Sequence, residues 1–543
     1  MYSPKYVIQR STVGGDSECH RCPDGRVRSI SPPQPPTTSS ECPRRGTFSV
    51  THLRRSLTSS FSQQVAIGKF PEKVLLEIFR YYLDAFPSLW PRLVHICRRW
   101  RRIVFAFQQV LHLGLYCTYG TLSLKTLDHW PTLPIVVSFG GSPELDYPAQ
   151  EDEDNITAAL KQSSRVRSIS LTVRSSLLGR FSVIDRPFSG LEELILLSRD
   201  GVQLTLPSNF QWGPRLRTLR VTRIAIPAFP QLLFFSRSLV DLQLHEVLDP
   251  WHVSPAKFVR ALSGMTQLQS LSLHFLSTSN HTLSPLPSGD RIILPLLTRF
   301  NFRGLNAYLE GLVARIDSPG LKDIEITLFL KRIFDVSKLS EFIDRIGMQK
   351  SHCRADILSS ERAISMSLTQ PGAPTCLKVQ VLSETLSGQV YSTAQICSHF
   401  SPFLFRVEDL CINLTRLPRR QDGVDGGQWL DLMDSFTGVK WFYLAGSLSK
   451  NVVLALQPSE RWRKTVLPAL HKLRIREPEP HDASLRKAVV SFVYSRRLSG
   501  HFLEAEYERP MANELLGQGT SYILRWHYTL TCLSRPFFSA GSD

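Results

Sequence analysis

Thiol and imidazole groups near the start of the chain are the first candidates for chemistry. Cys19 and Cys22 form a C-x-x-C, and Cys42 and His52 follow with nine residues between them. Zinc needs four ligands in a tetrahedral array, and structural zinc sites usually present two close pairs. Because the second pair is too widely spaced for that pattern, we interpret these groups as isolated thiols and predict no metal site.

An acidic run and three histidines are the next candidates. The run Glu-Asp-Glu-Asp over 151–154 has the composition of a metal cluster. Consecutive carboxylates point in divergent directions, so we expect a solvated loop, with Asn155 as the N-cap of a following helix. His245, His274 and His281 stand near expected strand ends, where a hydrogen-bonded or exposed histidine is commoner than a ligand or a base.

The usual catalytic motifs are absent from the sequence. It contains no G-x-x-x-x-G-K-[ST], no G-x-G-x-x-G, no H-E-x-x-H and no G-x-S-x-G. No set of nucleophile, base and orienting residue can be assembled from spacing alone. We therefore predict a protein that is not an enzyme, with no catalytic residues and no cofactor.

Composition limits the class of protein that could position functional residues. The 543 residues are 42% hydrophobic and carry a net charge of +17, so the chain can bury a core. Its positive charge is spread along the chain without a binding motif, which makes nucleic acid an unlikely partner. The sequence has no run of 18 apolar residues and no secretory signal, and ten cysteines are ordinary usage. We expect no membrane association, reduced thiols and a cytoplasmic or nuclear location.

The two ends of the chain have the composition of tails. Residues 1–66 are rich in Pro, Ser, Thr and Arg and lack apolar periodicity, so they cannot bury enough surface to offset the entropy of ordering. We predict a disordered basic tail over 1–66 and a second tail over 511–543.

Two short amphipathic helices are predicted directly after the first tail. Apolar residues at one-face helical spacing follow Pro71, which suits the first turn of a helix; they are Val74, Leu75, Ile78, Phe79 and Tyr82. A second helix is predicted from Leu93 to Phe107, with Arg98, Arg99, Arg101 and Arg102 on its polar side. Two helices in about 40 residues form a small core, so their remaining apolar surface requires a partner.

A short apolar motif recurs through the rest of the chain. It has the form apolar, two variable residues, apolar, one variable residue, apolar, and its first seven starts are separated by 25, 25, 23, 29, 29 and 24 residues. This spacing is close to the leucine-rich-repeat period of 20–29 residues. The copies are Val166-Ile169-Leu171, Leu191-Leu194-Leu196, Leu216-Leu219-Val221, Leu239-Leu242-Leu244, Leu268-Leu271-Leu273, Leu297-Phe300-Phe302, Leu321-Ile324-Ile326, Val407-Leu410-Ile412, Val439-Phe442-Leu444 and Leu470-Leu473-Ile475.

The segments between the motifs have helical character. Ser254 and Pro255 suit the start of a helix over 256–262, and Gly264 suits its end. We therefore predict an irregular leucine-rich-repeat-like α/β solenoid over 161–510, preceded by a linker over 108–160. Residues 330–400 lack a clean motif, so the array is interrupted or irregular there. An ordinary α/β domain with the same strands is the alternative.

The helical pair resembles a known family. The segments FPEKVLLEIF (70–79) and LVHICRRWRRIV (93–104) resemble an F-box, with its Leu-Pro start, Ile-rich first helix and V-C-x-x-W second helix. Phe70 replaces the usual Leu, and Ile96 replaces a common Val; both changes keep the apolar volume. The segments 115–117, 127–135 and 489–500 are similar to the large F-box families of basidiomycete fungi. The resemblance spans roughly residues 67–510 and places the F-box at 67–107.

The resemblance implies a function. An F-box protein of this type is the substrate-recognition adaptor of an SCF-type cullin–RING ubiquitin ligase. The F-box docks on a Skp-type adaptor, and through it on cullin, while the repeats hold an unknown protein substrate. The adaptor-binding residues would be Phe70, Pro71, Val74, Leu75, Ile78, Val94, Cys97 and Trp100. Trp100 is an expected hot spot of such an interface.

Two other functions remain open at this point. The helices could merely cap the first repeat of a scaffold that binds proteins without any ligase. The +17 charge could instead serve nucleic-acid binding, which would weaken steeply with salt.

Overall fold

A computed structural model describes residues 70–119, 127–130, 132–139, 149–200, 203–227, 229–247, 254–275, 291–329, 335–347, 354–369, 377–414, 424–457, 466–476 and 483–508. The two predicted tails, the C-x-x-C with Cys42 and His52, and His281 lie outside these residues. Within the described ranges, every helix is too short or too polar to span a bilayer.

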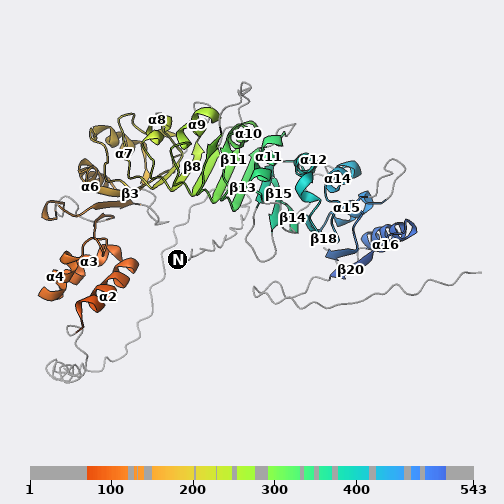
Figure 1. Cartoon of the computed structure of the whole chain (residues 1–543), viewed down its shortest axis with the longest axis horizontal. Coiled ribbons are helices and arrows are strands. Elements are labelled where there is room, and N and C mark those ends of the chain that lie inside the picture. Colours follow the sequence, from red (N-terminus) through yellow and green to blue (C-terminus); the bar gives the residue numbers. More distant parts are fainter. Residues whose placement is uncertain are drawn as a thin grey trace, which may run out of the picture. The chain divides into compact units, whose positions relative to one another are not determined.

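One open sheet of sixteen strands organises the described chain (Figure 1). Neighbouring strands are parallel everywhere except on the two sides of β15. In spatial order the strands are β1 (Leu115–Cys117), β2 (Ile135–Phe139), β3 (Val166–Val173), β4 (Glu193–Ser198), β6 (Thr218–Thr222), β8 (Asp241–Val247), β9 (Ser270–Phe275), β11 (Arg299–Gly304), β13 (Asp323–Phe329), β16 (Leu377–Leu382), β15 (Ala363–Thr369), β14 (Arg354–Ser359), β17 (Asp409–Leu414), β18 (Trp441–Gly446), β19 (Lys472–Arg476) and β20 (Glu504–Glu508).

Helices alternate with these strands, and successive helices pack against one another (Figure 1). They are α6 (Gln150–Lys161), α7 (Ser175–Arg180), α8 (Phe229–Phe234), α9 (Pro255–Leu262), α10 (Asn306–Val313), α11 (Ser337–Ile346), α12 (Leu386–His399), α13 (Ser401–Leu404), α14 (Gly426–Met433), α15 (Ser449–Ala455) and α16 (Ala483–Leu498). Short ribbons pair β5 (Leu204–Thr205) with β7 (Ile224–Ala225) and β10 (Ile292–Ile293) with β12 (Ile316–Asp317); a 3-10 helix, η4, spans Phe181–Val183.

The recurring apolar motif forms the strands, as the sequence predicts. In each copy the second and third apolar residues lie in register with those of the next strand: Leu242 pairs with Leu271, which pairs with Phe300. All residues of the ten copies are buried. The residue between the second and third motif positions lies on the opposite face of the strand, and it is polar in most copies; the exceptions are Ile195, Cys411 and Tyr443. Because each strand and helix buries one face against its neighbours, the units are stable only as an array.

The irregularity predicted between 330 and 400 is a change in strand order. After α11 the chain enters β14, turns back through β15 and returns through β16, which pairs with β13. The parallel array then resumes when β17 pairs with β14. An antiparallel hairpin therefore replaces one helix–strand unit at this point.

The array begins earlier than its predicted start at 161. The segment 108–160, predicted as a linker, contains β1, β2 and α6, and β2 pairs with β3 in parallel. The short strands β1 and β2 carry alternating buried residues, such as Ile135 and Val137, without the repeat motif. The linker prediction is therefore corrected: these residues supply the first two strands of the sheet.

The prediction that the acidic run over 151–154 is a solvated loop is wrong, because these residues lie in α6. Residues 151–153 occupy the first turn of α6, where carboxylates suit the positive end of the helix, and Asn155 lies inside the helix instead of capping it. Glu153 is buried, accepts a hydrogen bond from the Ser176 hydroxyl at 3.2 Å, and pairs with Arg180 at 3.5 Å. The run therefore packs against the next unit of the array.

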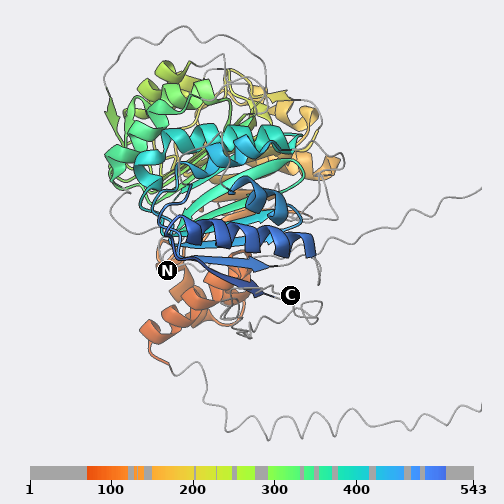
Figure 2. The ribbon, with the colours of Figure 1, turned by 90° about the vertical axis from the view of Figure 1, so that its right-hand side faces the viewer.

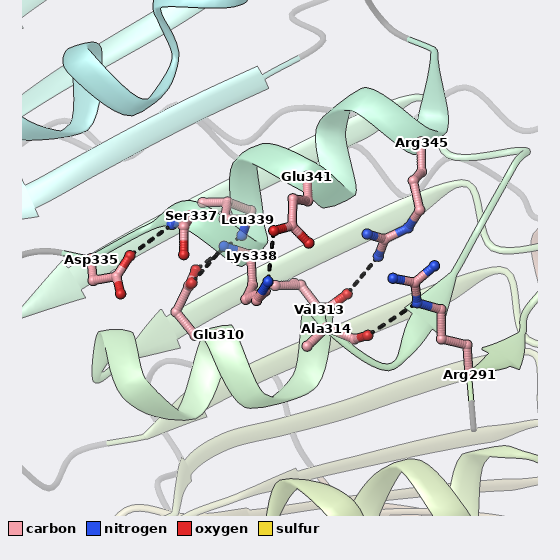
Figure 3. Close-up of polar contacts among 10 residues, drawn as sticks. All are labelled: Arg291, Glu310, Val313, Ala314, Asp335, Ser337, Lys338, Leu339, Glu341 and Arg345. Atoms are coloured by element: carbon pink, nitrogen blue, oxygen red, sulfur yellow. Dashed lines mark hydrogen bonds and ion pairs between the residues drawn. The ribbon is translucent and has the colours of Figure 1, made fainter. Parts of the chain in front are cut away.

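Two helix starts are capped in different ways, one from within its own unit and one from the neighbouring unit. Ser254 caps α9 as predicted, because its hydroxyl accepts the Lys257 N–H at 3.4 Å. The start of α11 has no cap from its own N-cap residue; instead the Glu310 carboxylate, from α10, accepts the N–H groups of Lys338 at 2.8 Å and Leu339 at 3.0 Å (Figure 3). Burial raises the pKa of Glu310 to about 7, although these two hydrogen bonds oppose the rise.

The predicted helical pair is present with one more break than expected. It consists of α2 (Glu72–Ala85), a 3-10 turn η3 (Pro87–Leu89), α3 (Trp90–Val94) and α4 (Arg98–Ala106). The single second helix predicted from Leu93 is therefore interrupted at 95–97. Cys97 is the N-cap of α4, and its Sγ accepts the Trp100 N–H at 3.5 Å.

Candidate interaction surfaces

The helix α2 has two apolar sides that differ in burial. Leu75 and Phe79 are buried and face the small core of the helical pair. Val74, Ile78 and Tyr81 are 42%, 43% and 83% exposed, and they share one side because they lie at i, i+4 and i+7. We call these three residues the α2 face. Its exposed apolar surface is the kind that a protein partner covers.

Trp100 serves the core of the pair. Its ring centroid lies 4.7 Å from that of Phe79, and the indole is only partly exposed. Val94 is buried. Ile96 and Cys97, in the turn between α3 and α4, are exposed, so this turn adds a second exposed apolar element.

The eight predicted adaptor-binding residues therefore divide into three groups. Exposed members are Pro71, Val74, Ile78 and Cys97; partly buried members are Phe70 and Trp100; buried members are Leu75 and Val94. The buried pair can support an interface only by holding the helices together. The prediction missed Tyr81 and Ile96, and the helical spacing from Val74 and Ile78 could have identified Tyr81.

Positive charge surrounds this module. Arg98, Arg101 and Arg102 are exposed on α4. Arg102 pairs with Glu72 at 3.0 Å across the two helices, and Arg101 donates to the Val94 carbonyl at 3.0 Å. A partner that contacts α4 would meet these arginines, which favours an acidic partner surface.

A separate set of aromatic residues fastens the helical pair to the array. The buried Trp90 donates its indole N–H to the Gly114 carbonyl, next to β1, at 2.7 Å. Its ring meets that of Trp130 edge-on at 5.5 Å, and Phe105 of α4 stacks on Trp130 at 5.1 Å. The residues that attach the pair are therefore distinct from those of the α2 face.

The open face of the sheet carries a hollow of about 550 Å³ across β14, β17, β18 and β19. Trp441 is exposed in the middle of this region, and Tyr443 follows on the same face of β18. Arg354, Lys472 and Arg474 also line the hollow. Tryptophan, tyrosine and arginine are the side chains most often responsible for binding energy in protein interfaces.

The charges around this hollow are mostly neutralised within the chain. Arg354 pairs with Asp356 at 2.8 Å, and Glu506 pairs with Lys472 at 2.6 Å and Arg474 at 3.3 Å. Cys411, on the floor, is a weak nucleophile because burial raises the pKa of its thiol to about 11. The hollow therefore has the character of a binding surface.

Two histidines on neighbouring strands of the array, His245 of β8 and His274 of β9, lie side by side. The rings of His245 and His274 stack with centroids 4.0 Å apart, and His274 lies 3.1 Å from the Asn301 side-chain oxygen. Burial, followed by the neighbouring ring, lowers the pKa of His245 to about 4. A search of the described residues for groups of three or more His, Cys, Asp or Glu able to hold a metal found none.

Comparisons with known proteins give little beyond this geometry. No family model matches the chain, and no curated protein matches it. Among solved structures, the leucine-rich repeat-containing protein LegL7 from Legionella pneumophila is similar at a TM-score of 0.24 and 14% identity, over 72% of this chain and 98% of that chain. Because that TM-score is low, the repeat architecture rests on the strand register of this chain, and the F-box resemblance stays a prediction.

Proposed function

We propose that this protein is a non-catalytic substrate-recognition adaptor of an SCF-type ubiquitin ligase. The observation that supports it is the α2 face: Val74, Ile78 and Tyr81 are exposed on the helix that resembles the first helix of an F-box. A buried Skp-type adaptor interface would remove this apolar surface from water. The exposed arginines of α4 suit an acidic adaptor surface.

The array would hold the protein to be ubiquitinated. The hollow around Trp441 is a candidate surface for this role, because it combines aromatic and arginine side chains on the open face of the sheet. The mechanism is positioning: the adaptor keeps the target near a ubiquitin-charged enzyme that the ligase supplies, so its effective concentration is high.

A repeat scaffold that binds proteins without a ligase is the second candidate. The contacts of Trp90 with Gly114 and Trp130 favour it, since they show that the helical pair covers the first strands of the array. A capping role leaves the exposed α2 face unexplained, however. We therefore place the ligase adaptor first.

The test uses the full chain co-expressed with the Skp-type adaptor of its source organism, with size-exclusion chromatography and light scattering. We expect a one-to-one complex that is lost when Val74→Asp and Ile78→Asp are combined. Because both residues are exposed, these changes should leave the fold intact. Val183→Asp combined with Leu454→Asp, at exposed apolar positions in the array, is the matched control.

The outcomes separate the two candidates. A complex that survives the α2 double change would place the adaptor site elsewhere. A well-behaved chain that forms no complex at all would favour the scaffold. Trp100→Ala is a poorer test than the sequence alone suggests, because loss of its contact with Phe79 would disturb the helical core.

A further inference from the structure

The last helix of the described array has an exposed apolar stripe. Val490, Tyr494 and Leu498 lie at i, i+4 and i+8 on α16 and are 52%, 64% and 73% exposed. Three such residues in line form one continuous side of a helix. We call them the α16 stripe. Phe502, just after the helix, is also largely exposed.

The position of α16 explains why this side is exposed. Inside the array a helix such as α14 packs against a helix on each side, here α12 and α15. Among the described helices, α16 packs against α15 alone in this manner (Figure 2). The α16 stripe therefore occupies the place where a following unit would pack.

The strand of the same unit is also incompletely covered. Ala505 and Tyr507 of β20 stand in register with Leu473 and Ile475 of β19, on the helix-facing side of the sheet. The β19 residues are fully buried, whereas Ala505 and Tyr507 are only partly buried. In the described sheet, β20 is the last strand, and β19 is its one neighbour. A repeat array needs a terminal cover at such an end.

The sequence that follows β20 has the order of one more unit. After Pro510 come the residues 511–516, of which Asn513 and Glu514 are polar and the other four apolar, and then Gly517. This order matches the helix and glycine that precede other strands. Alternation follows: Tyr522, Leu524, Trp526, Tyr528 and Leu530 are separated by single residues, which from 525 on are Arg, His, Thr and Thr. This period of two is typical of a strand with one buried face.

We propose that residues 510–532, instead of belonging to the tail predicted over 511–543, form the terminal cap of the array, packing on the α16 stripe and adding a strand beside β20. The apolar residues of the alternation would then continue the helix-facing row that ends at Tyr507. The polar ones would continue the open face. The strict alternation begins at Leu524, because residue 523 is Ile, and Leu524 lies 20 residues after Glu504, the first residue of β20. This distance is at the lower end of the 20–29-residue repeat period.

The first test is the fluorescence of Trp526 in the full chain. Subtracting the emission spectrum of the Trp526→Phe variant isolates this one indole among the nine tryptophans. We expect the difference spectrum to be blue-shifted, as for a buried indole, and to shift to the red in Tyr494→Asp. Tyr391→Asp, at an exposed position on α12, is the matched control and should leave the spectrum unchanged.

The second test is amide hydrogen exchange of Glu504 to Glu508 in the full chain. Leu524→Asp combined with Trp526→Asp should speed exchange of these amides by about tenfold or more, because the outer side of β20 would lose its cover. Phe537→Asp, beyond the proposed strand, is the control and should have no effect. Because this measurement does not use Tyr494→Asp, it tests the proposal even where that variant fails to fold.

Two results would overturn the proposal. One is a solvent-exposed Trp526 spectrum together with β20 exchange that the 524/526 change leaves unaltered. The other is a concentration-dependent dimer in light scattering that Tyr494→Asp disrupts but the 524/526 change does not, since a second copy would then cover the α16 stripe.

Discussion

The two ends of the repeat array differ in how they are closed. Next to the first strands, the rings of Trp90, Phe105 and Trp130 contact one another. Strand residues such as Leu115 and Ile135 are buried there. At β20 the helix-facing residues stay partly exposed, and α16 shows the α16 stripe to solvent. The comparison shows that the residues that attach the helical pair to the first strands, Trp90 and Phe105, are different from the exposed residues of the α2 face.

The largest effect on this comparison should come from Trp90→Ala. The change removes a buried indole, its 2.7 Å hydrogen bond to Gly114 and its contact with Trp130. We expect a loss of roughly 3–5 kcal/mol in the free energy of unfolding, which is typical of a buried tryptophan truncation. Urea denaturation measures it.

Phe86→Ala, at a nearby exposed residue, is the control and should stay within roughly 0.5 kcal/mol. If the two variants were equally stable, the first end would not be closed in the way described.

A neighbouring pair on α2 tests the separation of the two sides of that helix. Leu75→Ala should cost about 2–4 kcal/mol because Leu75 is fully buried, whereas Val74→Ala should cost less than about 0.5 kcal/mol. Thermal unfolding of both variants measures the contrast. Similar losses from the two would mean that the α2 face is structural and not free for a partner.

The cap that Glu310 of α10 provides for α11 lies inside the array and can be compared with the contacts at its two ends. Glu310→Ala removes the acceptor of two backbone N–H groups and should cost about 1–3 kcal/mol. The folded pKa of about 7 exceeds the usual 4.5, so the folded state holds the proton more tightly. Proton binding by Glu310 therefore stabilises the folded state fully below pH 4.5, and this stabilisation is lost as the pH rises to about 7.

Glu310→Gln should remove that part of the pH dependence, as read from denaturant midpoints between pH 4.5 and 7.5. Glu341→Gln is the control, because Glu341 is an exposed carboxylate on α11 that pairs with Lys338. An unchanged pH profile in Glu310→Gln would show that Glu310 titrates normally and that burial at this cap is weaker than described.

The smallest effect on stability should come from Trp441→Ala. Trp441 is exposed on the open face, so its removal should change the free energy of unfolding by less than about 0.5 kcal/mol. Tyr443, on the same face of β18, is less exposed, so Tyr443→Ala should lower the free energy of unfolding more than Trp441→Ala. A large loss in Trp441→Ala would make this tryptophan a structural residue and remove it from the proposed target-binding surface.

The strands of the array could be predicted because their signal is local. Each copy of the motif places two apolar residues on one face of one strand, and the copies pair in register. The strands β1 and β2 were missed because three to five residues carry too short a pattern. The burial of Glu153 could not be predicted because its partner Arg180 lies 27 positions later and meets it only in the folded array.

The sequence predicts an amphipathic helix at α2, but it does not predict which of its apolar residues are exposed. Apolar spacing on α2 includes both Leu75 and Val74, and nothing in the spacing tells which side meets α4. That choice depends on the contact of Phe79 with Trp100, which joins separate helices. The hollow around Trp441 had no sequence signal, since it is formed by four strands that are distant along the chain.

The hairpin at β14 and β15 has a consequence for how the chain reaches its folded state. Most paired parallel strands are 20 to 32 residues apart, as for Leu115 with Ile135 and Asp409 with Trp441. The pair Glu325 and Lys378 spans 53 residues, and the pairing of β14 with β17 spans 55, as for Arg354 and Asp409. Contacts between distant residues form slowly because loop closure costs entropy before the pairing compensates for it. Each side of the hairpin can meanwhile nucleate on short-range pairs. We therefore expect two folding nuclei, one in the strands up to β13 and one in the strands from β17 on, that merge late when the β14–β15–β16 segment docks between β13 and β17.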